Sequence, residues 1–246
     1  MKKLSLVVAL VFVCFIAASV SAQDFQKSYQ LGAGGQVRIR NISGNIVMTG
    51  YDGNAILVTA TKEGRDRDRV EVEDLSSGNR VDVKVHYPER CNNCEASINF
   101  EVKVPRSMNY NFDGISSVSG SVEISNISGN IKASSVSGEV KVREVSGTVN
   151  ASSVSGEVDV EITKLSGNDD MKFSSVSGEV DVRIPADLDA TVNMSTLSGN
   201  LKTDFPLEIK KRERYSPGTS ATGRLGDGSR RLHLSSVSGS VSLTRM

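Results

Sequence analysis

The sequence predicts an all-β chain wound as a parallel β-solenoid, a stack of short single strands joined by Ser-Gly corners. Two observations carry this prediction. An apolar residue followed by Ser-Gly recurs every nine residues through much of the second half of the chain, and runs of strictly alternating apolar and polar residues follow these corners. Such alternation is typical of strands with one buried face, and repetition at a fixed period is typical of stacked repeat folds.

The repeat contains two alternating kinds of corner. The string Ser-Ser-Val-Ser-Gly begins at residues 116, 134 and 152, eighteen residues apart, and returns at 174 and 235. Variant corners centred on Ile127, Val145 and Leu165 lie between these copies. Two corners, each followed by a strand, therefore recur every eighteen to twenty-two residues, and this predicts one coil of a solenoid with two sides. Each coil would stack about 4.8 Å above the previous one through parallel strand pairing.

Within each repeat, alternation predicts which side chains are buried. In the run 139–143 the two valines point inward and the three charged residues point outward. The glycine is expected to supply a corner with positive φ, while the neighbouring serine hydrogen-bonds the backbone. We also expect the corner valines of successive coils to touch in an interior row. These are Val136, Val154 and Val176.

The elements follow in order along the chain. Residues 1–22 are predicted to be a signal peptide and residues 23–246 a single β-solenoid domain. Alternating runs predict irregular N-terminal strands over 23–114, with a hairpin at 86–98. Regular repeats occupy 115–203, a long polar excursion rich in Gly, Ser and charged residues occupies 204–231, and closing strands occupy 232–246.

The N-terminus indicates export. Lys2 and Lys3 precede an apolar run over 4–20, and the small residues at 20–22 offer a cleavage site. A retained N-terminal anchor is the alternative, but the run lacks a basic stop-transfer flank. Lipidation at Cys14 is rejected because Val13 stands where a small residue is expected. We therefore expect a periplasmic, outer-surface or secreted protein without a transmembrane segment after cleavage.

Two cysteines follow the signal sequence, Cys91 and Cys94, in what the flanking runs predict to be a hairpin tip. In an oxidising compartment the predicted state is a disulfide ring. Free thiols remain an alternative, as does a zinc site that uses His86, although one cysteine pair and one histidine fall short of four ligands. No metal is assigned.

Composition excludes several functions. Basic and acidic residues balance at 29 each, so the chain lacks the basic face that nucleic-acid binding requires. Its two histidines, His86 and His233, lie far apart in sequence and outside known catalytic motifs, and the serines recur at fold positions. We therefore predict no catalytic residue and no cofactor.

Stacking predicts outward columns of charge, which are the candidate binding surface. The cation-binding or basic-partner hypothesis stands beside the simpler interpretation that solvated charges keep a flat sheet from aggregating. Residues 210–214 and 230–231 form basic clusters that could touch anionic polysaccharide or lipid, although interspersed acids favour a solvated loop. The column residues are Glu139, Glu157, Glu179, Asp159 and Asp181, with Arg143, Glu161 and Arg183 alternating in a further column.

These motifs resemble a known group. The repeated apolar-Ser-Gly corners, the Asn-Ile-Ser-Gly-Asn-Ile string at residue 41, the strand ends Val104-Pro105 and Ile184-Pro185, and the final Ser-Ser-Val-Ser-Gly resemble the bacterial putative-adhesin family nicknamed toast-rack. The resemblance covers essentially the whole mature chain. It implies a stacked β-fold at the cell envelope and brings no catalytic residues.

Three functions follow as hypotheses. The first is a non-enzymatic envelope or surface protein, adhesin-like, which presents a flat β face to an unknown glycan or envelope protein. The second is a self-assembling scaffold or stress-response accessory protein, joined end to end through uncapped coils. The third and weakest is a polysaccharide-acting enzyme, because long β-helices can host carboxylate catalysis.

Overall fold

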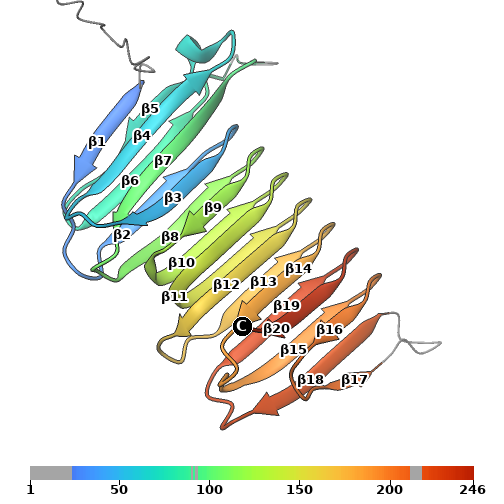
Figure 1. Ribbon diagram of the computed structural model, residues 1–246. Helices are drawn as coiled ribbons and strands as arrows, with labels where there is room; N and C mark the ends of the chain where they lie inside the picture. The colour runs from blue at the N-terminus through green and yellow to red at the C-terminus, as the bar shows by residue number, and fades with distance from the viewer. Residues whose placement is uncertain (1–23, 90, 92–93, 211–217) are drawn as a thin grey trace, which may run out of the picture.

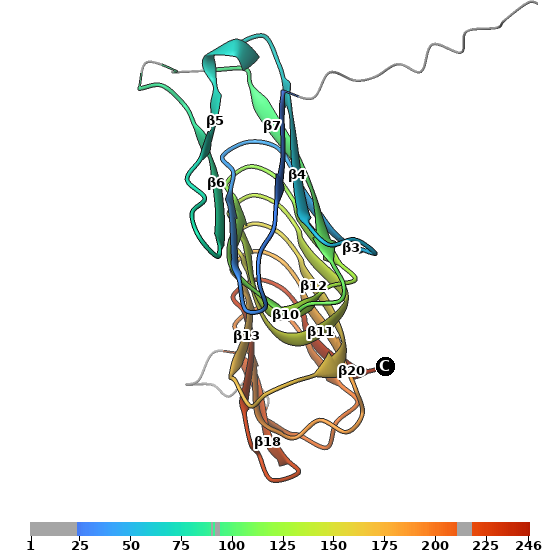
Figure 2. The ribbon, with the colours of Figure 1, turned by 90° about the vertical axis from the view of Figure 1, so that its left-hand side faces the viewer.

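The computed structural model describes residues 24–89, 91, 94–210 and 218–246. Within these ranges the elements are strands and one short 3-10 turn at Arg67–Arg69, so the all-β prediction is confirmed. The strands wind into a flattened coil with two faces, and the coils stack along one axis (Figures 1 and 2). The predicted signal peptide, residues 1–22, lies outside the described residues.

One side of the stack, here the serine face, carries a column of outward serines, for example Ser134, Ser152 and Ser174. Its strands, in spatial order, are β5 (Glu71–Asp74), β6 (Arg80–His86), β2 (Gln36–Arg40), β8 (Tyr110–Ser117), β10 (Ser128–Ser135), the second half of β11 (Val140–Ser153), β13 (Met171–Ser175), β19 (Arg231–Ser236), β15 (Ala190–Thr196), β18 (Thr219–Leu225) and β17 (Glu208–Lys210).

The other side, here the charged face, carries outward acidic and basic side chains. Its strands, in spatial order, are β1 (Phe25–Tyr29), β4 (Ile56–Glu63), β7 (Ser97–Pro105), β3 (Ile46–Tyr51), β9 (Val122–Ser125), the first half of β11, β12 (Val158–Leu165), β14 (Val180–Ile184), β20 (Val241–Arg245) and β16 (Leu201–Thr203).

The middle of the stack follows the predicted register. β10 pairs in parallel with the second half of β11, so that Ser134 lies beside Ser152, eighteen residues later. On the charged face, Val140 lies between Val122 and Val158 with the same offset. Inward side chains such as Val140 and Val142 are fully buried, and each contributes roughly 1.5–3 kcal/mol.

Both ends of the stack depart from the prediction of a purely parallel solenoid. β1, β4 and β7 pair antiparallel at one end, as do β5 and β6, and β15, β18 and β17 pair antiparallel at the other. An ion pair between Lys27 and Asp74 joins the two faces at the first end. The regular parallel stacking therefore stops at these antiparallel strands, which form both ends of the stack.

The spatial order of coils also differs from the chain order. β2 and β3 lie between the β6–β7 and β8–β9 coils, and β19 and β20 lie between the β13–β14 and β15–β16 coils. The prediction that residues 232–246 close the array is therefore wrong, because they are inserted one coil inside it. The polar excursion at 204–231 is also not irregular throughout, since it contains β17 and β18.

The predicted hairpin at 86–98 is wrong as well. β6 pairs with β5 and β2 on the serine face, whereas β7 pairs with β4 and β3 on the charged face. The loop between them therefore carries the chain from one face to the other, as the corners of the regular coils do. The alternating runs on either side of Cys91 and Cys94 could not reveal which partners each strand would choose.

The Ser-Ser-Val-Ser-Gly corners form one margin of the solenoid, here the valine edge, seen as the row of tips at the upper right of Figure 1. The predicted interior row of Val136, Val154 and Val176 is wrong, because these side chains are 42–45% exposed. The preceding serine takes the inward position instead: Ser135 Oγ donates to the Gly120 carbonyl oxygen at 2.8 Å. Period-two alternation then turns the valine outward.

At the Ser-Ser-Val-Ser-Gly corners, glycine is needed because the backbones of adjacent coils come very close, and not because the backbone has positive φ. A Cβ atom on Gly138 would lie 2.2 Å from the carbonyl oxygen of Gly120 in the next coil. Gly138 and the glycines of the other Ser-Ser-Val-Ser-Gly corners have no positive φ, so the predicted left-handed glycine is wrong at these corners, although Gly44 at the related Ile42 corner has φ of 105°. The prediction is correct at the other margin, here the opposite edge, where Gly129 and Gly147 have φ of 138° and 135°.

Candidate functional site

The structure stacks the predicted carboxylates beside the valine edge on the charged face. Glu139, Glu157 and Glu179 follow the glycines of three successive corners, and Val140 N–H donates to the Glu157 carbonyl oxygen at 2.9 Å. Asp159 and Asp181 pair in register in the adjacent outward column. Side-chain oxygens of Glu139, Glu157 and Asp159 all lie within 4.8 Å of one another, so the three form one cluster.

Cations lie among these carboxylates. Lys141 Nζ is 2.7 Å from Glu139 Oε1, and Arg183 Nη2 is 3.2 Å from Asp159 Oδ1. Arg143 also pairs with Asp159, so this nearly buried carboxylate has two guanidinium partners. The sequence predicts a column of the two arginines with Glu161, and Arg183 does reach Glu161 at 3.4 Å. The cross-column pairs to Asp159 were missed because they depend on side-chain reach.

Glu157 occupies a different environment from Asp159. Within the described ranges no basic side chain lies at ion-pair distance from it. Partial desolvation raises the pKa of its exposed carboxyl, and the neighbouring charges of Glu139, Asp159, Asp181 and Glu179 raise that pKa further. The cluster is therefore partly neutralised by arginine and lysine on one side and self-repulsive on the other.

A second outward column was not predicted from the sequence. Aliphatic side chains stand at seven consecutive corners of the valine edge, each 39–48% exposed, and backbone bonds such as Ser137 N–H to Val118 O at 2.9 Å hold them in line. The signal existed in the alternation, because a buried serine must be followed by an outward residue. In spatial order, this aliphatic column comprises Ile42, Val118, Val136, Val154, Val176, Val237 and Leu197.

The serine face is polar and shallow. A surface hollow of about 310 Å³ lies over β10, β11 and β13, with small residues such as Ala133 and Ser152 in its lining. Lys132 and Lys172 line the same hollow. Further along this face, His233 has a pKa lowered by burial and by the charge of Lys172. The repeat thus gives each face a different chemistry.

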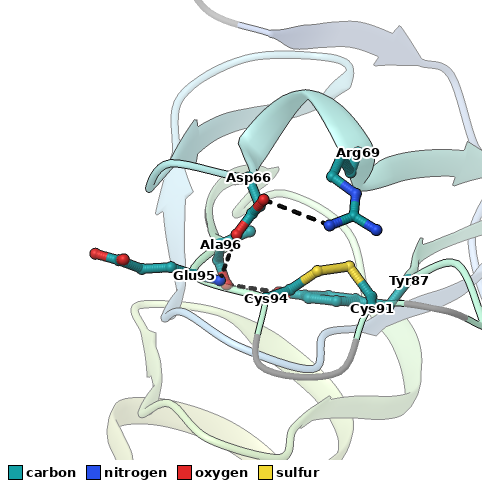
Figure 3. The surroundings of a disulfide bond; sticks show 7 residues. All are labelled: Asp66, Arg69, Tyr87, Cys91, Cys94, Glu95 and Ala96. Carbon is teal, nitrogen blue, oxygen red and sulfur yellow. Dashed lines mark hydrogen bonds and ion pairs between the residues drawn. A yellow bond between two sulfur atoms is a disulfide. The ribbon is translucent and has the colours of Figure 1, made fainter.

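The disulfide lies in the loop between β6 and β7, and Figure 3 shows its surroundings. Cys91 and Cys94 are joined by a disulfide, with their Cα atoms 5.2 Å apart. Nearby, Asp66 Oδ2 accepts a hydrogen bond from Glu95 N–H at 3.0 Å, and Tyr87 Oη donates to the Ala96 carbonyl oxygen. With its sulfurs bonded to each other, the pair offers no free thiolates for the alternative zinc site.

The two predicted basic clusters, residues 210–214 and 230–231, lie in different surroundings. Lys210 ends β17, while residues 211–214 lie outside the described residues. Arg231 is exposed and pairs with Asp170 at 2.6 Å, but it begins strand β19, so the side chain is solvated as predicted and the loop is not found there. Arg230 is buried, with only 8% of its surface exposed, so the solvated-loop interpretation is wrong for this residue.

Comparison with known proteins gives a family match. The family model described as Toastrack DUF4097 matches residues 36–244. A putative cell adhesion protein from Clostridium sporogenes is similar, with a TM-score of 0.46 and 11% identity over 90% of this chain and 99% of that one. A putative adhesin from Bacteroides fragilis has a TM-score of 0.42 and 15% identity over 90% and 96%.

The comparison with curated protein sequences finds no match. Across the described ranges, no helix combines the length and the hydropathy needed to cross a membrane.

Proposed function

Because the chain belongs to the Toastrack DUF4097 family, we propose that it is a non-enzymatic, exported protein of the cell envelope or surface that presents a flat β face to a glycan or protein partner. The family match bears out the resemblance carried by the corner motifs. The signal-like N-terminus and the disulfide support export. The observation that carries the proposal is the continuity of the outward columns along the stack.

This continuity suits recognition of extended partners. Backbone hydrogen bonds hold seven corners in line, so side chains recur at the strand spacing of about 4.8 Å on a rigid support. Rigid presentation lowers the entropy that binding would otherwise cost. The faces differ in charge and polarity, which gives each its own specificity.

Two face variants test the proposal. The charged-face variant replaces Glu139, Glu157 and Glu179 with Gln, and the serine-face variant replaces Lys132 and Lys172 with Glu. Saturable binding of the processed protein to glycan arrays or to purified envelope proteins should be lost in one variant and retained in the other, with both melting normally. Binding that neither variant alters, or turnover in a reducing-sugar assay on the bound polymer, would contradict the proposal.

A lateral self-assembling scaffold is the second candidate, favoured by the aliphatic column. Seven neighbouring exposed aliphatic side chains form a continuous apolar strip of the kind that marks contact surfaces. End-to-end joining is less favoured, because the end strand β17 has three residues, two of which are the charged Glu208 and Lys210. Sedimentation at rising concentration would reveal lateral assembly, and replacing Val136 and Val154 with Ser should abolish it.

A further inference from the structure

Arg230 is a buried cation in the turn between β18 and β19. Its Nη2 donates to the Gly167 carbonyl oxygen at 2.5 Å. Its Nε and Nη1 are shielded from solvent and have no hydrogen-bond partner within the described ranges. The neighbouring Arg231 behaves differently, since it is exposed and bound to Asp170. Arg230 is thus held in place by a single backbone acceptor.

Among the described residues, no carboxylate lies within ion-pair distance of Arg230. Arg40 and Arg80 differ from it, because they are only half-buried and share Asp82. A buried cation without an anion is costly, and buried charges in proteins are ordinarily paired. An unpaired guanidinium of this kind points to a missing partner.

A cavity of about 300 Å³ lies beside Arg230. The end of β12 and the loops after β14 and β18 form it, and they lie along the lower left margin of the stack in Figure 1. They meet because β19 is inserted between β13 and β15, which brings residue 230 next to residues 163–165 and 185–189. Lys164 adds a second cation to the lining, and Thr163 adds a hydroxyl.

Two carboxylates share this cavity with the cations. Asp189 is engaged within the protein, because its carboxylate accepts from Ser229 N–H at 3.1 Å. Hydrogen bonds from the backbone at 227–229 and from the Ser229 hydroxyl hold its pKa below the ordinary value. Asp187 is exposed in the same lining. The lining therefore offers donors for an anion and an acceptor for hydroxyl groups.

We propose that this cavity binds the carboxylate of an acidic sugar residue, with Arg230 and Lys164 as its cationic partners and Asp187 accepting from a sugar hydroxyl. The inference goes beyond the proposed function, because this site lies at the opposite edge and on neither flat face, and it assigns the site a ligand class, the uronate-bearing glycans. Lys164 is exposed and can reach the carboxylate directly, whereas the shielded guanidinium of Arg230 attracts the carboxylate by its charge from the wall of the cavity. A plain anion would satisfy the cations and leave Asp187 repulsive, whereas a hydroxylated carboxylate satisfies both. The site lies on the opposite edge, away from the aliphatic column.

The test is calorimetric titration of the processed protein with trigalacturonate at fixed ionic strength, with galactotriose as the neutral control. We expect trigalacturonate to bind saturably and to raise the melting temperature of the protein, and we expect galactotriose to do neither. Arg230→Met and Lys164→Gln should each weaken binding at least tenfold, whereas Arg231→Gln should leave it unchanged. Lys164 is exposed, so its variant keeps the test valid where Arg230→Met fails to fold.

Three results would overturn the inference. The first is absence of trigalacturonate binding, and the second is unchanged affinity in the Lys164 variant. The third is an equal rise in melting temperature with acetate or phosphate, which would indicate a general anion site. The face variants described above separate this outcome from failure of the proposed function. Glycan binding that depends on the charged face or the serine face, with no response to trigalacturonate, would leave the display function standing without this site.

Discussion

The tripeptide Val-Ser-Gly occurs at both edges of the solenoid, but its valine points outward at one edge and inward at the other. At the valine edge, Val136 of Val-Ser-Gly is 42% exposed, whereas at the opposite edge Val145 of the same tripeptide is fully buried. The residue before it makes the difference. Glu144 has φ of 52°, and this left-handed step turns Val145 inward, while Ser135 arrives in extended backbone and occupies the inward position itself.

Glycine has two separate uses in one repeat. At the Ser-Ser-Val-Ser-Gly corners it allows carbonyl oxygens of adjacent coils to approach, and at the opposite edge it adopts positive φ as well. The valine edge is uniform because each corner stacks on a closely similar corner. The opposite edge admits insertions, such as the loop at 165–170, and the candidate sugar cavity lies there.

The largest expected effect breaks the stacking at the valine edge. Gly138→Ala places a Cβ atom about 2.2 Å from the Gly120 carbonyl oxygen, so two backbones must separate. We expect a loss of about 3 kcal/mol or more in the free energy of unfolding, measured by urea denaturation. Gly32→Ala is the control, because its Cβ would come no closer than 3.7 Å to Asn79 Oδ1. Equal effects at both glycines would refute the close-approach explanation.

A pair of identical substitutions tests the opposite orientations directly. Val145→Ala removes buried methyl groups and should cost about 2–3 kcal/mol. Val136→Ala trims an exposed side chain and should cost less than about 1 kcal/mol. Both are measured by denaturant unfolding of the processed chain. A larger cost at Val136 than at Val145 would reverse the assignment of the two edges.

A smaller effect, of opposite sign, concerns the left-handed residue. Glu144→Asn should stabilise the protein by up to about 1 kcal/mol, because asparagine tolerates positive φ better than glutamate. The reciprocal change, Asn126→Glu, should destabilise by a similar amount, since Asn126 has φ of 57° at the preceding corner. Thermal melts of both variants check this pair, and a destabilised Glu144→Asn protein would contradict it.

The smallest expected effect is a pH dependence of stability. Glu157 follows a valine-edge corner, and its pKa is raised above the ordinary glutamate value by partial desolvation and by neighbouring carboxylates. The folded state therefore holds this proton more tightly than the unfolded chain, so its contribution to stability falls as pH rises above about 4.3. Glu157→Gln should remove that fall. Melting curves between about pH 4 and 7 measure it, with Glu208→Gln on β17 as the control.

Much of the middle of the molecule was predictable from local pattern. Strict alternation at 139–143 determined which side chains enter the core, and the eighteen-residue spacing determined that Glu139 and Glu157 would share a column. Both properties depend only on the geometry of a strand and on coils of equal length. Local pattern is therefore sufficient to identify the candidate carboxylate surface.

The exposed aliphatic column was within reach of the same reasoning and was missed. Alternation counted back from Val140 fails, because the corner resets it. Alternation counted forward from the buried Ile131 and Ala133 places Ser135 inward and Val136 outward, as the bond from the Ser135 hydroxyl to Gly120 shows. Because valine is apolar and serine is polar, Val136 was predicted to be buried and Ser135 was not.

Local residue pattern was enough to predict the strands of the regular repeats, the repeat length and the charged columns, because these follow from backbone geometry and side-chain alternation. The order of the coils, the antiparallel ends and the burial of Arg230 became visible only in the folded chain. These depend on which strands far apart in the chain pair with one another. β19 lies between β13 and β15 because each strand edge must find hydrogen-bond partners, and local residue pattern does not specify which distant strand supplies them.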